Sequence, residues 1–339
     1  GPIPSDPAYG DNPFGKDQVD VAIKRGIDYL VSEQIDEGRF AGAINDGQRQ
    51  NHLVAMTSLS IMAMAAVGHQ PTDPTPEGIA MSRAIDFVLK PKNQAGGQYF
   101  GADGSRMYGH GITTLMLAEM LGMGVDEDQD ERIRSSLQNA VNLILASQQQ
   151  RKPRQYQGGW RYTPASRDSD LSVSVWQVMA LRSAKNAGLS IPAESIDQAV
   201  AYIRGCYSQR HGAFAYVPQR APDYAMVAAG ALSMQVCGQY DADEVQGAAV
   251  WLNSNELNYQ HHWFFYGTYY YAQSMYQRGG TYAQRARSRV EDILLRHQSE
   301  AGFWAGSSGQ ENSAGRVYTT AMAVLSLSVK YHYLPIYQR

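Results

Sequence analysis

Six copies of one short pattern constrain the fold of this 339-residue chain more than any other feature. The pattern is approximately a small residue, an apolar residue, a polar residue and a second apolar residue. It recurs at intervals of about 40 to 60 residues. These intervals are within the usual range of helical repeats or slightly above it. The copies lie at residues 26–29, 84–87, 140–143, 199–202 and 249–252, with a looser copy at 290–295.

Each copy is followed by a turn and then by a second, more apolar segment. Five turns combine glycine with an aromatic residue, and the fifth pair has HHWFF at 261–265 instead. In the second segments the apolar residues recur at helical period and charge is almost absent, which is typical of helices buried on most sides. These inner helices are predicted at residues 51–67, 108–123, 170–187, 223–237, 266–278 and 317–331.

Twelve helices in six pairs, one of each pair amphipathic and the other apolar, predict a closed ring with the apolar helices inside. The predicted fold is therefore all-α, a single (α/α)6 toroid of six helical hairpins over residues 17–339. No polar capping repeat is present at either end, as an open solenoid would require. Residues 1–16, rich in Pro and Gly, are expected to form an irregular arm, and the last segment, HYLPIYQR, to pack back on the ring.

Charge and composition exclude several classes of partner. The formal net charge is -3 and there is no long basic run, so neither nucleic acid nor an anionic membrane surface is an expected partner. The longest apolar runs fall far short of the ~20 residues of a transmembrane helix. The two cysteines, Cys206 and Cys237, are interpreted as free thiols, with one disulfide left open.

The candidate binding site is the mouth where the turns enter the inner helices, because the ring brings their first residues together. With 22 Tyr and 5 Trp in the chain, an aromatic-lined cavity is expected there. Such a cavity can stabilise a cation, stack on sugars or bind a peptide. Tyr266 and Tyr270 are one turn apart and can share an inward face. The binding candidates are His52, Tyr108, His110, Trp160, Tyr162, Asp223, Trp263, Tyr266, Tyr270, Arg316 and Tyr318.

No metal or cofactor is predicted. The chain has no Cys-x2-Cys or His-x3-His spacing, and the adjacent His261 and His262 would not face each other on a helix. The glycine-rich phosphate and dinucleotide loops and the GxSxG motif are absent from the sequence as well.

Four of the turns share a glutamine ahead of the glycine and the aromatic residue: Gln34 to Phe40, Gln94 to Tyr99, Gln209 to Phe214 and Gln298 to Trp304. This spacing resembles the QW repeat of the prenyltransferase and squalene oxidase repeat family, and it is in phase with the helical period over nearly the whole chain. The stretches 107–123 and 266–280 and the terminal YLPIYQR resemble a single-toroid bacterial branch of that family.

The resemblance implies a toroid with an isoprenoid or other apolar ligand, and it also bears on assembly and location. Triterpene cyclases of the family place the substrate between two helical barrels, so a homo-oligomer or a partner domain is expected to complete the site. The bacterial branch often carries export signals. The opening Gly1-Pro2 is typical of a protease scar, so a signal peptide would be missing from this sequence; export and a cytoplasmic location both stay open.

An acidic pair gives this resemblance a chemical interpretation. The GGW turn at 158–160 is followed by DSDLSVSVW at 168–176, which resembles the DxDD motif of squalene-hopene cyclases. The resemblance assigns Asp168 to the first acidic position and Asp170 to the residue that protonates the alkene, while Leu171 replaces the last Asp. The activating His of those enzymes has no counterpart in residues 222–230.

The same residues suit the start of a helix, where Asp and Ser cap free N–H groups. We therefore expect a capping or ligand-orienting role first, with acid catalysis by Asp170 and Asp168 as the second interpretation.

Three functions remain open at this point. The first is a terpenoid-cyclase-like toroid that holds an apolar chain, with degenerate class II (isomerase) chemistry if it is active. The second is a non-catalytic module for a glycan, a peptide or a protein. The third is a glycoside-cleaving enzyme, in which Asp168 would face Asp223 or Glu119 across the cavity.

Overall fold

The computed structural model describes residues 17–46, 52–307, 309–331 and 333–338. The predicted N-terminal arm, residues 1–16, lies outside the described residues. Six outer helices are α1 (Gln18–Ser32), α3 (Pro76–Val88), α5 (Glu127–Gln148), α7 (Ala193–Gly205), α9 (Asp243–Ser254) and α11 (Gly280–His297). Six inner helices are α2 (Leu53–Ala66), α4 (Arg106–Met120), α6 (Leu171–Asn186), α8 (Tyr224–Val236), α10 (Phe264–Arg278) and α13 (Arg316–Leu327).

Short elements occupy the connections. They are the helix α12 (Gly309–Ala314), the 3-10 turns η1 (Pro91–Asn93), η2 (Phe100–Asp103), η3 (Arg154–Tyr156), η4 (Ser328–Tyr331) and η5 (Pro335–Tyr337), and the antiparallel strands β1 (Tyr207–Ser208) and β2 (Ala213–Phe214). Among the described helices, none combines the length and apolar character that crossing a membrane requires.

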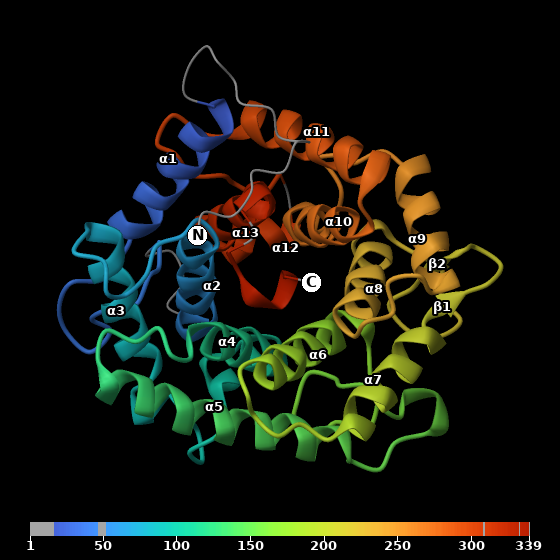
Figure 1. The fold of residues 1–339 in the computed structure, drawn as a ribbon, viewed down its shortest axis with the longest axis horizontal. Helices are drawn as coiled ribbons and strands as arrows, with labels where there is room; N and C mark the ends of the chain where they lie inside the picture. Colours follow the sequence, from blue (N-terminus) through green and yellow to red (C-terminus); the bar gives the residue numbers. More distant parts are fainter. Residues whose placement is uncertain (1–16, 47–51, 308, 332, 339) are drawn as a thin grey trace.

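The helices form two concentric rings (Figure 1). Each inner helix packs against the next one along the chain, and α13 packs against α2, so the inner ring is closed. In the outer ring α1 contacts both α3 and α11. The predicted (α/α)6 toroid is confirmed.

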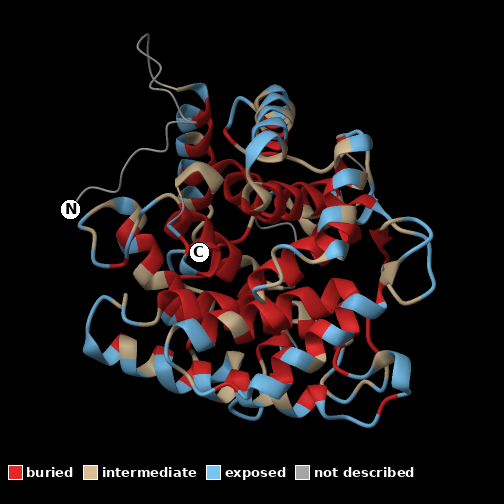
Figure 2. Cartoon of the chain, turned by 45° about the vertical axis from the view of Figure 1, so that its right-hand side comes forward, coloured by how far each residue is buried: buried red, intermediate tan, exposed pale blue. Residues whose placement is uncertain are grey.

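Burial follows the two rings. The inner helices are buried on nearly all sides, whereas the outer helices expose one face to solvent (Figure 2). In α1, for example, Val19, Ile23 and Ile27 are buried on one stripe and Asp20, Lys24 and Asp28 lie on the opposite face. The contrast in apolar content between the two segments of each repeat arises from this difference in environment.

In four hairpins a backbone N–H of the turn donates to a side chain of the following inner helix. The backbone N–H of Ile44 donates to Thr57 Oγ1 at 3.0 Å, that of Trp160 to Ser174 Oγ at 2.9 Å, and that of Trp304 to Thr320 Oγ1 at 3.1 Å. In the second hairpin Phe100 N–H donates to His110 Nδ1 at 3.2 Å. The buried residue of the first two turns is thus Ile44 or Phe100, and the predicted Phe40 and Tyr99 are only half-buried.

Glutamine amides join neighbouring hairpins. Gln34 Nε2 donates to the carbonyls of Gly42 and Ala80, and Gln298 Nε2 donates to those of Gly302 and Ala22. Gln148, which the spacing did not single out, donates likewise to Gly158 and Ser195 carbonyls. In each case one bond stays within the repeat and the other reaches the next outer helix, so the Gln298 bond links the last repeat to the first.

The last segment packs back on the ring, as expected, and it closes one end. Its carboxyl end lies in the middle of the ring in Figure 1. Gln277 Nε2 donates to the Tyr337 carbonyl at 2.7 Å, the Tyr337 and Tyr269 hydroxyls are hydrogen-bonded, and Ile336 N–H donates to Glu119 at 3.3 Å. Because Gln277 and Glu119 lie near the C-terminal ends of α10 and α4, η5 forms the floor of the toroid, and the opposite end is the mouth.

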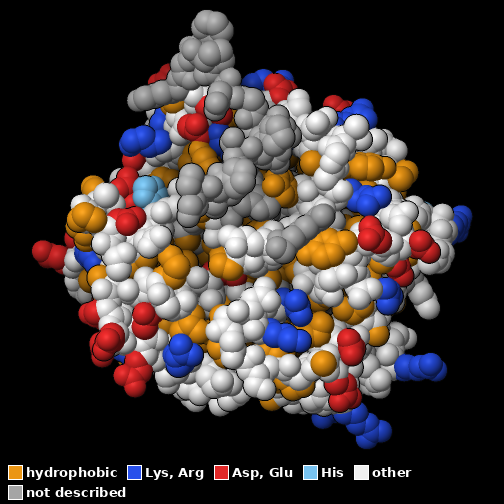
Figure 3. All heavy atoms as spheres, in the orientation of Figure 1, with side chains coloured by type: hydrophobic (Ala, Val, Ile, Leu, Met, Phe, Trp, Pro, Cys, Tyr) orange, Lys and Arg blue, Asp and Glu red, His pale blue; other side chains and the backbone are white. Residues whose placement is uncertain are grey.

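The surface carries charges of both signs. On the face shown in Figure 3, acidic and basic side chains are interspersed around the rim and do not gather into a patch of one sign. Cys206 and Cys237 are both free thiols, so the disulfide left open is not formed.

Candidate functional site

A cavity of about 920 Å³ lies at the mouth of the toroid, between the N-terminal ends of the inner helices. This volume is within the range of about 300–1,000 Å³ that is usual for small-molecule sites. Its lining comprises His52, Ala55, Met56, Leu59, Gly104, Ser105, Arg106, Tyr108, Gly109, Ile112, Tyr162, Ser172, Tyr216, Asp223, Ala225, Met226, His262, Trp263, Tyr266, Gln310, Ser313, Ala314 and Tyr318.

Most of the predicted binding residues meet here. His52, Tyr108, Tyr162, Asp223, Trp263, Tyr266 and Tyr318 all line the cavity. His110, Trp160, Asp168, Asp170, Tyr270 and Arg316 do not.

His110 and Trp160 belong to the core between the two rings. His110 Nε2 lies 3.0 Å from the Ala140 carbonyl, and complete burial lowers the pKa of His110 to about 4, so the ring is neutral near pH 7. Because its Nδ1 accepts the Phe100 N–H, Nε2 is the protonated nitrogen and donates to Ala140. The indole of Trp160 donates to the Ile144 carbonyl at 2.9 Å. Both side chains are therefore structural.

Arg316 and Tyr270 lie outside the cavity for different reasons. The Arg316 guanidinium stacks 4.2 Å from the centre of the Phe303 ring. Tyr270 is fully buried behind Tyr266, with ring centroids 5.4 Å apart, and supports that ring from below.

The lining changes from polar to apolar with depth. A helix rises about 5.4 Å per turn, so position along an inner helix measures depth. The first residues at the mouth include His52, Arg106 and Asp223. Three to seven residues further along, the same helices present Met56, Leu59, Ile112 and Met226. The cavity thus has a polar rim and an apolar interior, with tyrosine hydroxyls between them.

Three lining residues have a backbone conformation that is unusual for residues other than glycine. The φ angles of His52, Arg106 and Trp263 are 66°, 58° and 62°, in the left-handed region. Such conformations persist where the surrounding structure imposes them, and they cluster at functional sites. Here each one turns a large side chain toward the cavity at the start of α2, α4 or α10.

Carboxylates from other segments cap two of these helices. Asp103 accepts the N–H groups of Val54 and Ala55 at the start of α2, and Glu311 accepts that of Phe265 at 2.9 Å at the start of α10. The N-cap residues His52 and Trp263 make no side-chain capping bond of their own. Their side chains are therefore available to the cavity.

Asp170 caps α6 itself, as the sequence indicated, and it is fully buried. Its Oδ1 accepts the Val173 N–H at 2.9 Å and the Ser172 hydroxyl at 2.6 Å. Its Oδ2 accepts the Tyr216 hydroxyl at 3.1 Å and lies 3.2 Å from Nε of Arg161. Ser172 and Tyr216 line the cavity, so they stand between the carboxylate and any ligand.

Arg161 lies between the two predicted acids. It pairs with Asp168 at 3.3 Å as well as with Asp170, so Asp168 faces a cation rather than sharing a proton with Asp170. Burial raises the pKa of Asp170, while its hydrogen bonds to Ser172 and Val173, the Arg161 charge and Tyr216 oppose that rise. The arrangement is an ion pair between a buried carboxylate and a half-buried guanidinium, not a pair of carboxyls competing for one proton.

Asp223 is the only carboxylate among the described residues that line the cavity. Burial raises its pKa, and its hydrogen bonds to Met226 and Ala225 and the nearby His262 lower it. Glu119 lies at the floor, 13 residues or about 20 Å along α4 from Arg106. Asp168 is on the far side of Arg161. The paired carboxylates of a glycoside-cleaving site are therefore not assembled among the described residues of the cavity.

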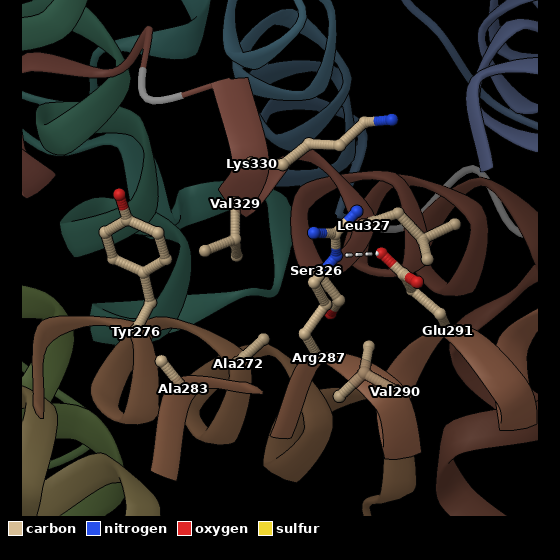
Figure 4. A pocket seen from close by; sticks show the side chains of 10 residues that line it. All are labelled: Ala272, Tyr276, Ala283, Arg287, Val290, Glu291, Ser326, Leu327, Val329 and Lys330. Carbon is tan, nitrogen blue, oxygen red and sulfur yellow. Dashed lines mark hydrogen bonds and ion pairs between the residues drawn. The ribbon is translucent and has the colours of Figure 1, made fainter. Parts of the chain in front are cut away.

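Two other hollows differ from this cavity in size or in exposure. The hollow in Figure 4, between α10, α11 and the segment after α13, has a volume of about 20 Å³, close to that of one water molecule, and contains an Arg287–Glu291 pair at 2.7 Å. An open groove of about 770 Å³ runs along the ends of α5 and α7 and is lined largely by glutamine and basic side chains.

Sequence patterns did not single out Arg106, Tyr216, Ser172 or Arg161. Arg161 follows the GGW turn directly, and the backbone pairing of Trp160 with Asp170 brings it beside the acids. That pairing joins segments ten residues apart and has no periodic signal.

The fold and the site together define a helical toroid with an aromatic-lined central cavity. Within the described residues, no group of His, Cys, Asp and Glu side chains is arranged to hold a metal ion.

No protein-family model matches the chain, and no curated protein matches it by sequence. Solved structures match its fold. The apo type II terpene cyclase MstE from Scytonema is 15% identical with a TM-score of 0.59, covering 94% of this chain and 99% of that one. Cellobiose 2-epimerase from Bacillus thermoamylovorans is 9% identical with a TM-score of 0.65, covering 91% and 98%. A glycosidase in complex with glucose is 11% identical with a TM-score of 0.62, covering 95% and 100%. These likenesses show the shared toroid and leave function to the site.

Proposed function

We propose that this protein binds an isoprenoid or a similar apolar chain in its central cavity. The observation that carries the proposal is the lining: the deeper wall is made of Met56, Leu59, Ile112 and Met226, and aromatic rings surround it. Burying apolar surface contributes about 25 cal/mol per Å², so an apolar chain gains more from this wall than a polar ligand does.

A structural neighbour supports the same ligand class. A variant of the terpene cyclase MstE, 14% identical to this chain, has been solved in complex with geranylgeranyl dihydroxybenzoate, described as its substrate. The QW-like turns add the resemblance to the prenyltransferase and squalene oxidase repeat family. The proposal rests on the cavity lining first, because one fold can host several functions.

We propose binding rather than protonation as the main function. Class II cyclisation needs a carboxylic acid that carries a proton and faces the alkene. Asp170 accepts three hydrogen bonds, is paired with Arg161 and is separated from the cavity by two hydroxyl groups. In this proposal Asp170 and Asp168 organise the cavity wall.

A non-catalytic glycan-binding or peptide-binding role is the second candidate. The observation that favours it is the open groove at α5 and α7, whose amide and basic side chains suit a polar ligand. Its lining includes Gln148, Gln149, Gln150, Arg151, Lys152, Arg154, Gln155 and Gln157.

Thermal unfolding with a ligand panel tests the two candidates. Geranylgeraniol and squalene represent the apolar class, and cellobiose represents the glycans. We expect geranylgeraniol to raise the melting temperature, since a ligand at 100 times its Kd stabilises by about 2.7 kcal/mol. Stabilisation by cellobiose alone would favour the second candidate.

A matched pair of variants locates the binding. Met56→Trp adds bulk at a half-buried cavity position, whereas Ile79→Trp adds the same bulk on the outer face of α3, where the side chain is 56% exposed. Geranylgeraniol should stabilise Ile79→Trp as it does the parent and should lose its effect on Met56→Trp. Equal stabilisation of both variants would contradict binding in the cavity.

Mass spectrometry of the incubated ligands tests catalysis separately. We expect squalene and geranylgeraniol to be recovered unchanged. Cyclic products that disappear in Asp170→Asn would overturn the binding-only proposal and establish the acid role.

A further inference from the structure

The hydrogen bonds between Asp170 and the hydroxyl groups around it have a fixed donor-to-acceptor direction, and this direction determines which groups the cavity wall offers to a ligand. A serine or tyrosine hydroxyl carries one proton, so it can donate one hydrogen bond while accepting others. If the acceptor at the end of a chain of hydroxyls is known, the direction of every bond in that chain follows.

The ionised carboxylate of Asp170 is that end. Two of its partners carry protons that they cannot give up: the Val173 N–H, which donates at 2.9 Å, and the Arg161 guanidinium, which forms an ion pair at 3.2 Å. A proton on either carboxylate oxygen would compete with these groups and remove the anionic partner of the half-buried Arg161 guanidinium. The geometry therefore favours the acceptor-only form of Asp170.

Two hydroxyl chains run from Asp170 to the cavity. In the first, Ser172 donates to Oδ1 at 2.6 Å and its oxygen is hydrogen-bonded to the Tyr108 hydroxyl. In the second, Tyr216 donates to Oδ2 at 3.1 Å and its oxygen is hydrogen-bonded to the Tyr162 hydroxyl.

In both hydroxyl chains the last tyrosine, Tyr108 or Tyr162, can only donate its proton to the hydroxyl before it. Ser172 and Tyr216 have already used their protons on Asp170, so Tyr108 and Tyr162 must be the donors in the outer bonds. Their remaining hydrogen-bonding capacity is then lone pairs, which only accept. Both tyrosines line the cavity, and their rings are neighbours with centroids 6.0 Å apart.

We propose that Tyr108 and Tyr162 form an acceptor subsite that binds the hydroxyl group of an otherwise apolar ligand. The inference rests on the proposed function and names the ligand class within it: an isoprenoid alcohol rather than a hydrocarbon or an ether. Asp170 and Arg161 are positioning residues, because they act on the ligand only through the direction of the hydroxyl chains.

The test compares geranylgeraniol with its methyl ether, which keeps the apolar chain and loses the donor. Affinity is measured by titration calorimetry with the full chain. We expect the alcohol to bind about tenfold more tightly than the ether, the effect of roughly one hydrogen bond in an apolar site. In Tyr108→Phe combined with Tyr162→Phe, the two ligands should bind with similar affinity.

The variant Asp170→Asn separates direction from bulk. Its amide oxygen can keep the Val173 and Ser172 bonds, while its amide N–H would donate to Tyr216. Tyr216 would then donate to Tyr162, and Tyr162 would offer its proton to the cavity. The ether should regain several-fold in affinity in this variant although the cavity volume is unchanged.

The outcomes distinguish the two proposals. Equal affinities for alcohol and ether in the parent protein would overturn the acceptor subsite and leave the apolar cavity standing. Binding of neither ligand would overturn the proposed function, and the subsite with it. If Asp170→Asn does not fold, the comparison of the parent with the double Tyr→Phe variant still decides the inference.

Discussion

Burial inside the toroid changes the pKa of two single carboxyl groups, Glu119 and Glu311. Glu119 at the floor is 4% exposed, and burial raises its pKa to about 7 although Ser183 and the Ile336 N–H donate to it. Glu311 at the mouth has its pKa raised to about 7 by burial as well, against the opposing N–H groups of α10. Each is ionised in water near pH 6 and largely protonated inside the protein.

Glu119 should make stability depend on pH in a defined direction. Its pKa is about 7 in the folded chain and 4.5 when unperturbed, so its stabilising effect is complete below pH 4.5 and is lost as pH rises through 7. Glu119→Gln should match the parent at pH 4.5 and exceed it at pH 8 by up to about 3 kcal/mol in the free energy of unfolding.

Urea unfolding at both pH values measures this difference. Glu131→Gln, on an exposed part of α5, serves as the control and should show no such gain. A Glu119→Gln variant that is equally destabilised at pH 4.5 and pH 8 would show that the carboxyl is not held protonated.

For single residues, the sequence predicted the helix cap at Asp170, but it did not predict the side chains that contact Asp170 or line the cavity from the loops. Asp170 ends an Asp-Ser-Asp stretch at a helix start, so its capping role was predicted and is confirmed. Tyr216 lies in an irregular segment without period, Arg106 starts α4 with a left-handed φ that no pattern indicates, and Arg161 meets Asp170 through the pairing of Trp160 with Asp170. The contacts of these residues depend on the path of the loops, which no local pattern specifies.

At the scale of elements, glutamine amides hold adjacent hairpins in register. Gln298 is the most informative of them, because its two acceptors belong to opposite ends of the chain: Ala22 in α1 and Gly302 in the last turn. Arg25 reinforces this seam through the carbonyls of Ser299 and Glu300.

Gln298→Ala should lower the free energy of unfolding by about 1–3 kcal/mol, because it leaves two carbonyls without a donor. Gln298→Glu should cost at least as much, since a carboxylate cannot donate. Gln150→Ala, on the exposed rim, should change stability by less than about 0.5 kcal/mol. Chemical denaturation measures all three. If Gln298→Ala leaves the free energy of unfolding unchanged, Gln298 does not stabilise the junction between the last and the first repeat.

The inner helices were predictable because their period and lack of charge reflect burial on every side. The residues of the turns were harder to predict. The amide of Gln148 reaches Gly158 across ten residues, a gap longer than the pattern allowed. Phe40 and Tyr99 fitted the aromatic position in sequence, yet Ile44 and Phe100 are the residues that the turns bury.

At the scale of the whole molecule, closure produces the cavity. Six inner helices start at one end, so their polar first turns form the rim, and η5 closes the other end. The ring and its inner and outer layers were predictable from the repeat, whereas the floor depends on where the last segment lies.

Tyr337→Ala tests the floor. The ring of Tyr337 is 3% exposed, and its loss should cost about 3–5 kcal/mol in unfolding free energy. Tyr333→Ala, at a position 48% exposed in the same segment, should cost less than about 1 kcal/mol. Calorimetric melting temperatures report both, and similar melting points for the two variants would mean that η5 does not seal the ring.

The central claim is that the closed ring holds an isoprenoid alcohol in its central cavity, and a crystal structure of the protein with geranylgeraniol tests it most directly. We predict continuous ligand density between Met56, Ile112 and Met226, with the hydroxyl group within hydrogen-bond distance of Tyr108 or Tyr162. Density for the ligand only on the outer surface, with the cavity free of it, would contradict the account.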